Sequence, residues 1–374
     1  MLDPTAYLTP SDLNRALTLR DLTDPSSGPH AMQLLLSQIV KDLTSRWGVP
    51  ATTVRVPPLV AVADNYDLLG YNRSDVTRAS RYTRYTSPTT MLRSHTSANV
   101  GHALSSYADR DRPVDELIVV PGLVYRRDVV DRTHVGEPHQ VDLWRLRSQP
   151  GTSPDDLMIM VGSLVEAVLP GARWRTTVVT HPYTREGRQV DVRYGSEWLE
   201  LAECGLIHPD VLGRCGLDPD RWSGLALGMG LDRALLLRKE IPDIRYLRST
   251  EPRISAQLVD LAPWRPVSML PPIARDLSVV IESETDEELI GDAIRSALGD
   301  RVGDIESIEI RQRTAYDDLP TAARRRLGLL PGQENALIRL VLRPLDHTLT
   351  DADANELRNQ VYRAIHRGPV LELA

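Results

Sequence analysis

Phenylalanine is absent from all 374 residues of the chain, although tyrosine occurs 12 times and tryptophan 6 times. Aromatic side chains are therefore accepted as a class, and the phenyl side chain alone is missing. Cysteine is also scarce, since Cys204 and Cys215 are the only two and form no Cys-x-x-Cys motif. Their scarcity argues against a disulfide framework and a cysteine zinc site, and reduced thiols in a cytoplasm fit best.

Long apolar stretches are missing too. No run approaches the roughly 18 residues of a membrane-spanning helix, and residues 1–10 lack the basic and apolar parts of a secretory signal. We therefore expect no membrane contact and a cytoplasmic location. Lysine occurs only at Lys41 and Lys239, so nearly all positive charge is arginine, while the net charge is −7. A nucleic-acid partner would have to meet a local arginine patch.

The length of the chain favours two domains, one large and one small, because 374 residues exceed a single core of usual size. The proline-rich stretch 262–266 and the pair Pro271-Pro272 are rigid and poorly helical, which is typical of a linker. We place the boundary there, with a first domain at residues 1–262 and a second at residues 263–374.

Hydrophobic periodicity predicts an α+β fold for the first domain. Helices are expected at residues 32–47, 157–169 and 229–240, where apolar side chains recur at helical spacing or glycines open a helix. Strands are expected at residues 53–56, 59–62, 116–120, 122–126, 141–146, 176–180, 189–194 and 198–204. Several of these strands alternate in polarity, which indicates an antiparallel sheet flanked by helices.

The second domain shows a different order of elements. We expect a strand at 276–281, a helix at 286–298, strands at 305–313 and 336–342, a helix at 350–366 and a strand at 370–373. This βαββαβ order is the ferredoxin-like plan.

Four segments carry polar side chains in patterns that suit ligand binding. They are Leu92-Arg93-Ser94-His95-Thr96-Ser97-Ala98; Tyr125-Arg126-Arg127-Asp128 with Thr133-His134 and His139-Gln140; Glu197-Trp198-Leu199-Glu200-Leu201-Ala202-Glu203-Cys204-Gly205 with His208-Pro209; and Gly224-Leu225-Ala226-Leu227-Gly228-Met229-Gly230-Leu231-Asp232-Arg233.

The spacing within these segments has a chemical meaning. Arg126 and Asp128 share one face of an extended chain, as do His95 and Ser97. Arg233 follows alternating glycines that let the backbone approach a flat ligand closely. Two arginines from separate elements suit a bent polyphosphate, which they would hold by charge-assisted hydrogen bonds.

Each segment also has a plainer interpretation when taken alone. The glycine run could be a packing joint between a strand and a helix, and Arg126-Arg127 could be a solvated face. His134 and His139 could be loop surface, and the histidines lack metal-ligand spacing.

Taken together, the segments resemble motifs 2 and 3 of class II aminoacyl-tRNA synthetases. The Ser-His-Thr-Ser, Tyr-Arg-Arg-Asp, Thr-His, His-Gln and Cys-Gly-x-x-His-Pro segments, and residues 241–245 (Ile-Pro-Asp-Ile-Arg), look like phenylalanyl-tRNA synthetase. Residues 271–278 and 343–350 resemble its ferredoxin-fold anticodon-binding domain. The resemblance runs from about His30 to the end, in the domain order of the single-chain organellar enzyme, which implies a monomer that needs no separate second subunit.

The resemblance implies an ATP site and an amino-acid site. Arg126 would hold the α-phosphate, Arg233 the γ-phosphate and adenine, and His134 the β- and γ-phosphates. Glu200 would contact Mg²⁺ or the ribose. The remaining residues of the implied ATP site are Asp128, Pro138, Gly228 and Gly230. Those of the implied amino-acid site are His95, Ser97, Asp128, Gln140, His181, Tyr183, Glu203 and Ala226.

The amino-acid pocket departs from the family pattern. The family has Phe-Pro-Phe-Thr where this chain has His181-Pro182-Tyr183-Thr184, and Gly-Cys-Gly where it has Glu203-Cys204-Gly205. Either the pocket has changed for a more polar amino acid, or the whole chain has lost phenylalanine. Phenylalanine is also missing where the family often has it at Pro138, Leu225, Leu227 and residues 278–280, which favours the second explanation. Glu203 replaces glycine and is not explained by it.

These observations lead to one expected function and two alternatives. We expect ATP-dependent activation of phenylalanine and its transfer to tRNA-Phe. The first alternative is a paralogue that activates a phenylalanine analogue or a more polar aromatic amino acid, in a biosynthetic or self-resistance role. The second is a non-catalytic tRNA-binding regulator, against which the retained arginines Arg126 and Arg233 argue.

Overall fold

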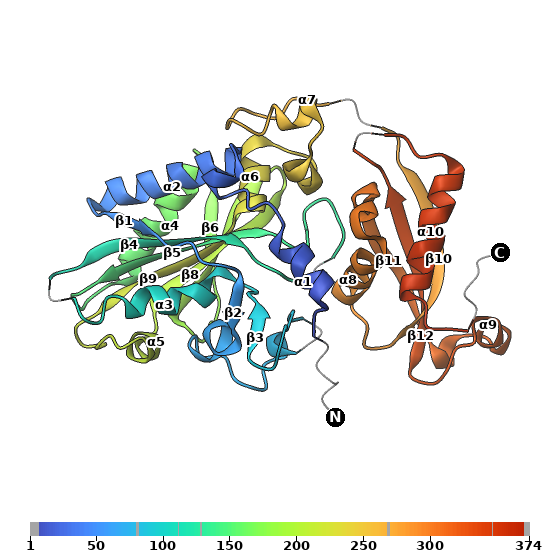
Figure 1. Cartoon of the computed structure of the whole chain (residues 1–374), viewed down its shortest axis with the longest axis horizontal. Coiled ribbons are helices and arrows are strands. Elements are labelled where there is room, and N and C mark those ends of the chain that lie inside the picture. Colours follow the sequence, from blue (N-terminus) through green and yellow to red (C-terminus); the bar gives the residue numbers. More distant parts are fainter. Residues whose placement is uncertain are drawn as a thin grey trace. The chain divides into compact units, whose positions relative to one another are not determined.

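The computed structural model describes residues 7–79, 82–110, 112–127, 129–267, 270–345 and 347–369. They form two compact units (Figure 1). The large unit comprises the chain up to Arg126, Glu137–Ile241 and Gln257–Trp264, and the small unit comprises Arg127–Gly136, Pro242–Ala256 and the chain from Arg265. The small unit therefore takes in two internal segments that precede the predicted boundary at residues 262 and 263.

A seven-stranded sheet organises the large unit. Its order is β1 (Ala51–Thr53), β4 (Asp115–Leu123), β5 (His139–Arg147), β9 (Ser223–Gly230), β8 (Glu197–Ile207), β7 (Thr184–Tyr194) and β6 (Trp174–Val178). Only β1 and β4 pair in parallel, and every other neighbouring pair is antiparallel. The predicted antiparallel sheet is confirmed.

The strands predicted at 116–120 and 122–126 are one strand, β4, which ends at Leu123, so the predicted division and the predicted end at residue 126 are wrong. Its residues from Asp115 to Leu123 pair without interruption with Arg147 to His139 of β5. Gly122 permits this continuation, because it adopts a φ of 140° that side-chain-bearing residues rarely reach.

Helices cover both faces of this sheet. Figure 1 shows α2 (Ala31–Trp47), α4 (Pro154–Val168) and α6 (Leu231–Lys239) along one face, and α3 (Val100–Ser105) and α5 (Pro209–Arg214) along the other. His30 caps the start of α2, where its Nδ1 accepts from Met32 N–H, and Gly48 caps the end in the left-handed region. Ser153 and Asp156 form a capping box on α4. Both helices thus have sequence-encoded ends.

The shorter elements of the large unit connect or flank these layers. They are α1 (Pro10–Leu17), the 3₁₀ turn Pro25–Ser27, β2 (Leu59–Ala61), the π-helical turn Ala63–Asp67, the 3₁₀ turn Val76–Arg78, β3 (Thr90–Leu92) and the 3₁₀ turn Thr96–Asn99. Strands β2 and β3 pair with each other in a separate two-stranded sheet.

A buried lysine holds the last segment of the large unit in place. Lys239, at the end of α6, has only 1% of its side chain exposed. Its Nζ donates to the backbone carbonyl of Asp260 at 2.9 Å, to the Asp260 carboxylate at 3.0 Å and to the Ala262 carbonyl at 2.6 Å. Three acceptors satisfy the three donors of an ammonium group, so this charge can be buried.

The small unit has its own three-stranded antiparallel sheet in the order β10 (Ile273–Glu282), β12 (Gln333–Leu342) and β11 (Ile305–Ala315). Helices α8 (Glu287–Leu298) and α10 (Asp351–Ile365) pack with it around one apolar core. The strand predicted at 370–373 lies outside the described residues. The remaining elements of this unit are α7 (Pro252–Ser255), α9 (Thr321–Leu327) and the 3₁₀ turns Ile244–Arg248, Gly299–Asp304 and Tyr316–Asp318.

The two internal segments are bound firmly to the rest of the small unit. Val130 belongs to its apolar core, and Arg132 pairs with Glu306. Arg245 donates from Nη1 to the carbonyls of Gly303, Ile305 and Arg343 at 2.9–3.0 Å. Among the described residues, no helix is long and apolar enough to cross a membrane.

Candidate active site

A floor of glycine lies on one face of the large sheet. Strand register puts Asp142 of β5, Gly228 of β9 and Glu203 of β8 in one row, and Gln140 opposite Gly230 in the next. A Cβ built on Gly228 or Gly230 would meet no heavy atom within 4 Å, so the space above both residues is open. We call this space the slot.

Other glycines of the same sheet are closely packed. A Cβ on Gly224 would lie 2.1 Å from the Arg145 carbonyl oxygen, and one on Gly205 would lie 2.6 Å from Cβ of Thr184. The glycine run of β9 therefore has two roles. Gly224 allows tight packing, as the plainer interpretation of the run expects, whereas Gly228 and Gly230 leave room for a ligand.

The buried carboxylate of Asp142 stands at the edge of the slot. It accepts hydrogen bonds from Thr96 Oγ1 at 2.6 Å, Ser97 Oγ at 2.9 Å and Trp144 Nε1 at 2.9 Å. Burial raises the pKa of Asp142 against the effect of these bonds. A carboxylate held in this way can receive an ammonium group.

Sequence reasoning missed Asp142, although a signal was present. Gln140, Asp142 and Trp144 alternate with the apolar Val141 and Leu143, which places the three side chains on one face of β5. Gln140 was identified as a site residue, and the same periodicity extends that face to Asp142.

The segment that contains His95 and Ser97 lies beside this carboxylate. Ser97 binds Asp142 directly. Asn65 Nδ2 lies 3.4 Å from His95 Nε2, while His95 Nδ1 is buried without a hydrogen-bond partner. Burial, with the charges of Arg126 and Arg93, lowers the pKa of His95 to about 3. His95 is therefore neutral and retains hydrogen-bonding capacity at Nδ1 for a ligand.

Arg126 follows the end of β4, Arg233 lies in the first turn of α6, and the charges of both reach Glu200. Arg126 donates from Nε to the Ser94 carbonyl at 2.7 Å, and Arg233 donates from Nη1 to the Glu200 carbonyl at 3.4 Å. Both cations act to lower the pKa of Glu200, although burial and the charge of Glu203 raise it overall. Two guanidinium groups thus lie within electrostatic reach of one carboxylate.

The wall of the slot consists of stacked rings and one hydrogen-bonded pair, Glu203 and His181. His181 stacks on Tyr183 with 5.2 Å between ring centroids, and Tyr183 stacks on Trp144 at 6.5 Å. Tyr183 also packs against the cluster that contains the buried Ala226. Burial raises the pKa of Tyr183 well above its usual range, so its hydroxyl stays neutral.

The structure does not assemble every predicted site residue. Asp128 lies outside the described residues. His134 belongs to the small unit, where its Nδ1 contacts the Asp131 carboxylate at 2.9 Å, so its contact with phosphate stays a prediction. Pro138 is half-buried and its carbonyl accepts from Val124 N–H at 2.9 Å.

His139 is not loop surface, and that interpretation is wrong. Its side chain is fully buried, its Nε2 accepts from Leu22 N–H at 3.0 Å, and its Nδ1 lies 3.1 Å from Asp232. The first bond leaves the proton on Nδ1, which donates to Asp232. This pair ties β5 to the start of α6, next to Arg233.

The metal prediction rests on Glu200 alone. Among the described residues, no group of three or more His, Cys, Asp and Glu side chains could hold a metal ion. Mg²⁺ is commonly bound by one or two carboxylates together with substrate phosphates. A single carboxylate fits that arrangement only with substrate phosphates as the other ligands.

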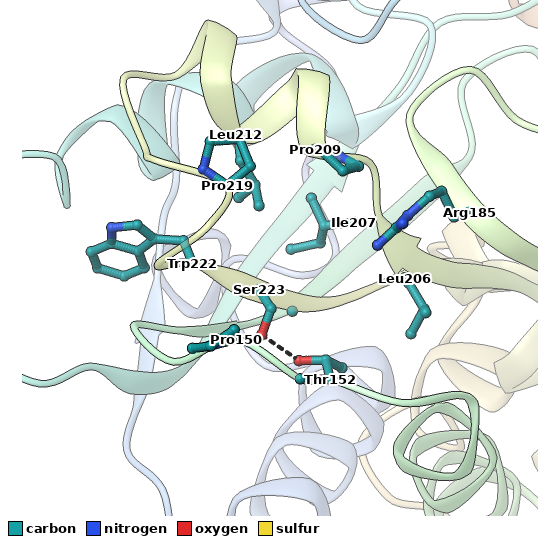
Figure 2. A pocket seen from close by; sticks show the side chains of 12 residues that line it. Pro150, Thr152, Arg185, Leu206, Ile207, Pro209, Leu212, Pro219, Trp222 and Ser223 are labelled. Carbon is teal, nitrogen blue, oxygen red and sulfur yellow. Dashed lines mark hydrogen bonds between the residues drawn. The ribbon is translucent and has the colours of Figure 1, made fainter.

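A second hollow of about 260 Å³ lies at the opposite end of β8 and β9 (Figure 2). Ile207, Leu212 and Trp222 line it, and Ser223 Oγ lies 2.7 Å from Thr152 Oγ1. None of the predicted site residues lines this hollow. We therefore assign the chemistry to the slot.

A large, mostly antiparallel sheet with a glycine floor and flanking arginines is the arrangement of a class II synthetase core. Comparison with known families agrees, because residues 37–258 match the model described as the tRNA synthetases class II core domain (F). The match covers more than half of the chain. The chain belongs to this family.

Curated relatives point in the same direction. The phenylalanine–tRNA ligase alpha subunit of Prochlorococcus marinus (strain MIT 9313) is 34% identical over 242 residues, covering 63% of this chain and 69% of the relative. The alpha subunit of Mycobacterium avium (strain 104) is 31% identical, covering 64% and 70%. The chloroplastic/mitochondrial phenylalanine–tRNA ligase of Arabidopsis thaliana is 26% identical, covering 84% and 71%.

Proposed function

We propose that this chain activates phenylalanine with ATP and transfers it to tRNA-Phe. The observation that carries the proposal is the slot, an open space above glycines with the buried carboxylate of Asp142 at one side. The charges of Arg126 and Arg233 both act on Glu200 in the same sheet. The names of its relatives support phenylalanine as the amino acid.

The residues divide the work of adenylate formation between them. Asp142 would bind the α-ammonium group of the amino acid. Thr96 and Ser97 would hold the Asp142 carboxylate in place through their hydrogen bonds to it. Arg126 would neutralise charge at the α-phosphate, and Arg233 at the γ-phosphate. The substrate carboxylate is itself the nucleophile, so the site needs no general base. Catalysis would come from positioning and charge neutralisation during an in-line displacement at phosphorus.

Mg²⁺ is the metal we propose, with Glu200 as its protein ligand. When bound, it would neutralise phosphate charge. His134 would contact the β- and γ-phosphates, and Pro138 would lie against adenine. Gln140 and His95 would hydrogen-bond the polar end of the amino acid.

The small unit is proposed as a ferredoxin-fold anticodon-binding domain. Its core elements β10, α8, β11, β12 and α10 follow the order strand, helix, strand, strand, helix, with the short helix α9 inserted between β11 and β12. The Arabidopsis relative aligns over 84% of the chain. We also propose that the enzyme is a monomer and that it acts in the cytoplasm.

Amino-acid-dependent pyrophosphate exchange tests this function directly. Purified protein would be assayed with ATP, Mg²⁺ and each of the twenty amino acids, followed by charging of tRNA-Phe. Phenylalanine should support the fastest exchange and should be transferred to tRNA. A protein that binds tRNA without any exchange would instead be a non-catalytic regulator.

A further inference from the structure

The hydrogen bond between Glu203 and His181 is a polar feature in an otherwise aromatic wall. Glu203 Oε2 lies 3.0 Å from His181 Nε2. This bond to His181 is the main cause of a lowered pKa at Glu203, so Glu203 is ionised at neutral pH. An ionised carboxylate only accepts, and the Nε2–H of His181 therefore donates to it.

The pair does not close Glu203 off from the slot. The side chain of Glu203 is 36% exposed, whereas that of His181 is 11% exposed. Glu203 stands directly opposite Gly228, above which no heavy atom lies within 4 Å of a built Cβ. A carboxylate oxygen beyond the one bound to His181 is therefore available on the side where a ligand would lie.

We propose that Glu203, oriented by His181, is a specificity-determining residue that binds a hydrogen-bond donor on the ring of the amino acid. The substrate class then includes phenylalanines with a ring hydroxyl group as well as phenylalanine. This inference rests on the proposed function, because it concerns the same slot and the same reaction.

The pairing explains why both kinds of ring are accepted. A site that leaves a buried polar group unpaired rejects a substrate without the matching group. Glu203 and His181 satisfy each other, so a plain phenyl ring leaves neither of them without a partner. A ring hydroxyl adds one hydrogen bond to a charged acceptor, which is among the stronger kinds.

Glu203 is the charged hydrogen-bond acceptor among the residues of the wall. The Tyr183 hydroxyl remains protonated, and the Trp144 indole N–H is already donated to Asp142. The Tyr71 ring lies 6.3 Å from that of Tyr183, and burial raises the pKa of Tyr71 to about 12. Among these wall residues, Glu203 alone carries a negative charge.

Steady-state pyrophosphate exchange with phenylalanine, meta-hydroxyphenylalanine and para-hydroxyphenylalanine tests the inference. The measured quantity is the ratio of kcat/KM for each hydroxylated substrate to that for phenylalanine. In Glu203→Gly the ratio for at least one isomer should fall about tenfold or more relative to wild type. Glu203→Gln keeps the size of the side chain and an acceptor oxygen, so the ratio should fall less in this variant. Glu197→Gln, which removes an exposed carboxylate from the same strand, serves as the matched control and should leave all ratios unchanged.

The outcomes separate this inference from the proposed function. If wild type activates phenylalanine and the ratios stay the same in both Glu203 variants, the specificity role is overturned and the proposed function stands. A wild type that activates no amino acid overturns both. Should Glu203→Gly prove unstable, Glu203→Gln alone decides, since an unchanged ratio in a folded Gln variant contradicts a charged acceptor.

Discussion

The seven-stranded sheet of the large unit and the three-stranded sheet of the small unit carry polar residues in different ways. In the small sheet these residues form pairs with each other: Arg339 binds Asp276 twice at 2.8 Å, and Ser278 Oγ binds Asn335 at 2.7 Å. Beside the large sheet, the space above Gly228 and Gly230 is open, and His95 Nδ1 is buried without a hydrogen-bond partner. These pairs on the small sheet need no ligand, whereas the large sheet carries open space beside the buried carboxylate of Asp142. This difference marks the large sheet as the reaction site.

The largest effect on activity should come from replacing Arg126 or Arg233, if the large sheet is the reaction site. Arg126→Ala and Arg233→Ala should each slow pyrophosphate exchange strongly, because charge on the phosphates is no longer neutralised. The expected loss of transition-state stabilisation is on the order of 3 kcal/mol or more. Circular dichroism should show an intact fold. Near-normal exchange in a folded Arg233→Ala protein would refute its assignment to the γ-phosphate.

Asp142→Asn should lower activity and raise the stability of the ligand-free protein. Loss of the charge should reduce kcat/KM for phenylalanine roughly 100-fold, since the ammonium group loses its counter-ion. The ligand-free protein should become more stable at neutral pH, because the fold no longer buries a carboxylate.

The pH dependence of Asp142 has a defined sign. The raised pKa means that the folded state holds this proton more tightly than the unfolded state, so stability should fall as pH rises from about 4 through the folded pKa. Urea unfolding at several pH values should show a smaller decline for Asp142→Asn than for wild type. A decline of equal size in both proteins would contradict the raised pKa.

Arg245→Ala should destabilise the small unit. Three backbone carbonyls would lose their shared donor, at a cost of about 2–3 kcal/mol in the free energy of unfolding. Thermal unfolding of the whole chain would measure the effect. Arg253→Ala is a suitable control, because Arg253 lies in the same segment with 65% of its side chain exposed.

Asp276→Asn should have the smallest effect. Its partner Arg339 is on the surface of the small sheet, and solvent screens such pairs strongly. The melting temperature should barely change. A large drop in melting temperature would mean that this exposed pair stabilises the small sheet more than a solvent-screened ion pair should.

Local signals in the sequence were sufficient for the large sheet and the main helices. The alternating glycines predicted a close approach of a ligand to the backbone, and the space above Gly228 and Gly230 is open. Gln140 and Glu203 were identified through the family resemblance, and the hydrogen bond between Glu203 and His181 appears only in the structure.

Features that depend on distant packing could not be predicted. Nothing near residues 127–136 signals that Val130 joins the core of the small unit. His139 looked like loop surface because its partners, Leu22 and Asp232, are more than 90 residues away in the chain. The continuous strand β4 was divided because Pro121-Gly122 usually indicates a break.

The burial of Lys239 has a practical consequence for labelling. The chain has only one other lysine, Lys41, which is exposed on α2. Because the Lys239 amine is held by three acceptors inside the fold, an amine-directed dye should modify a single lysine side chain in the native protein. Lys41 thus offers a ready attachment point for a fluorophore, and exposure of Lys239 to the same reagent would report local unfolding at the end of α6.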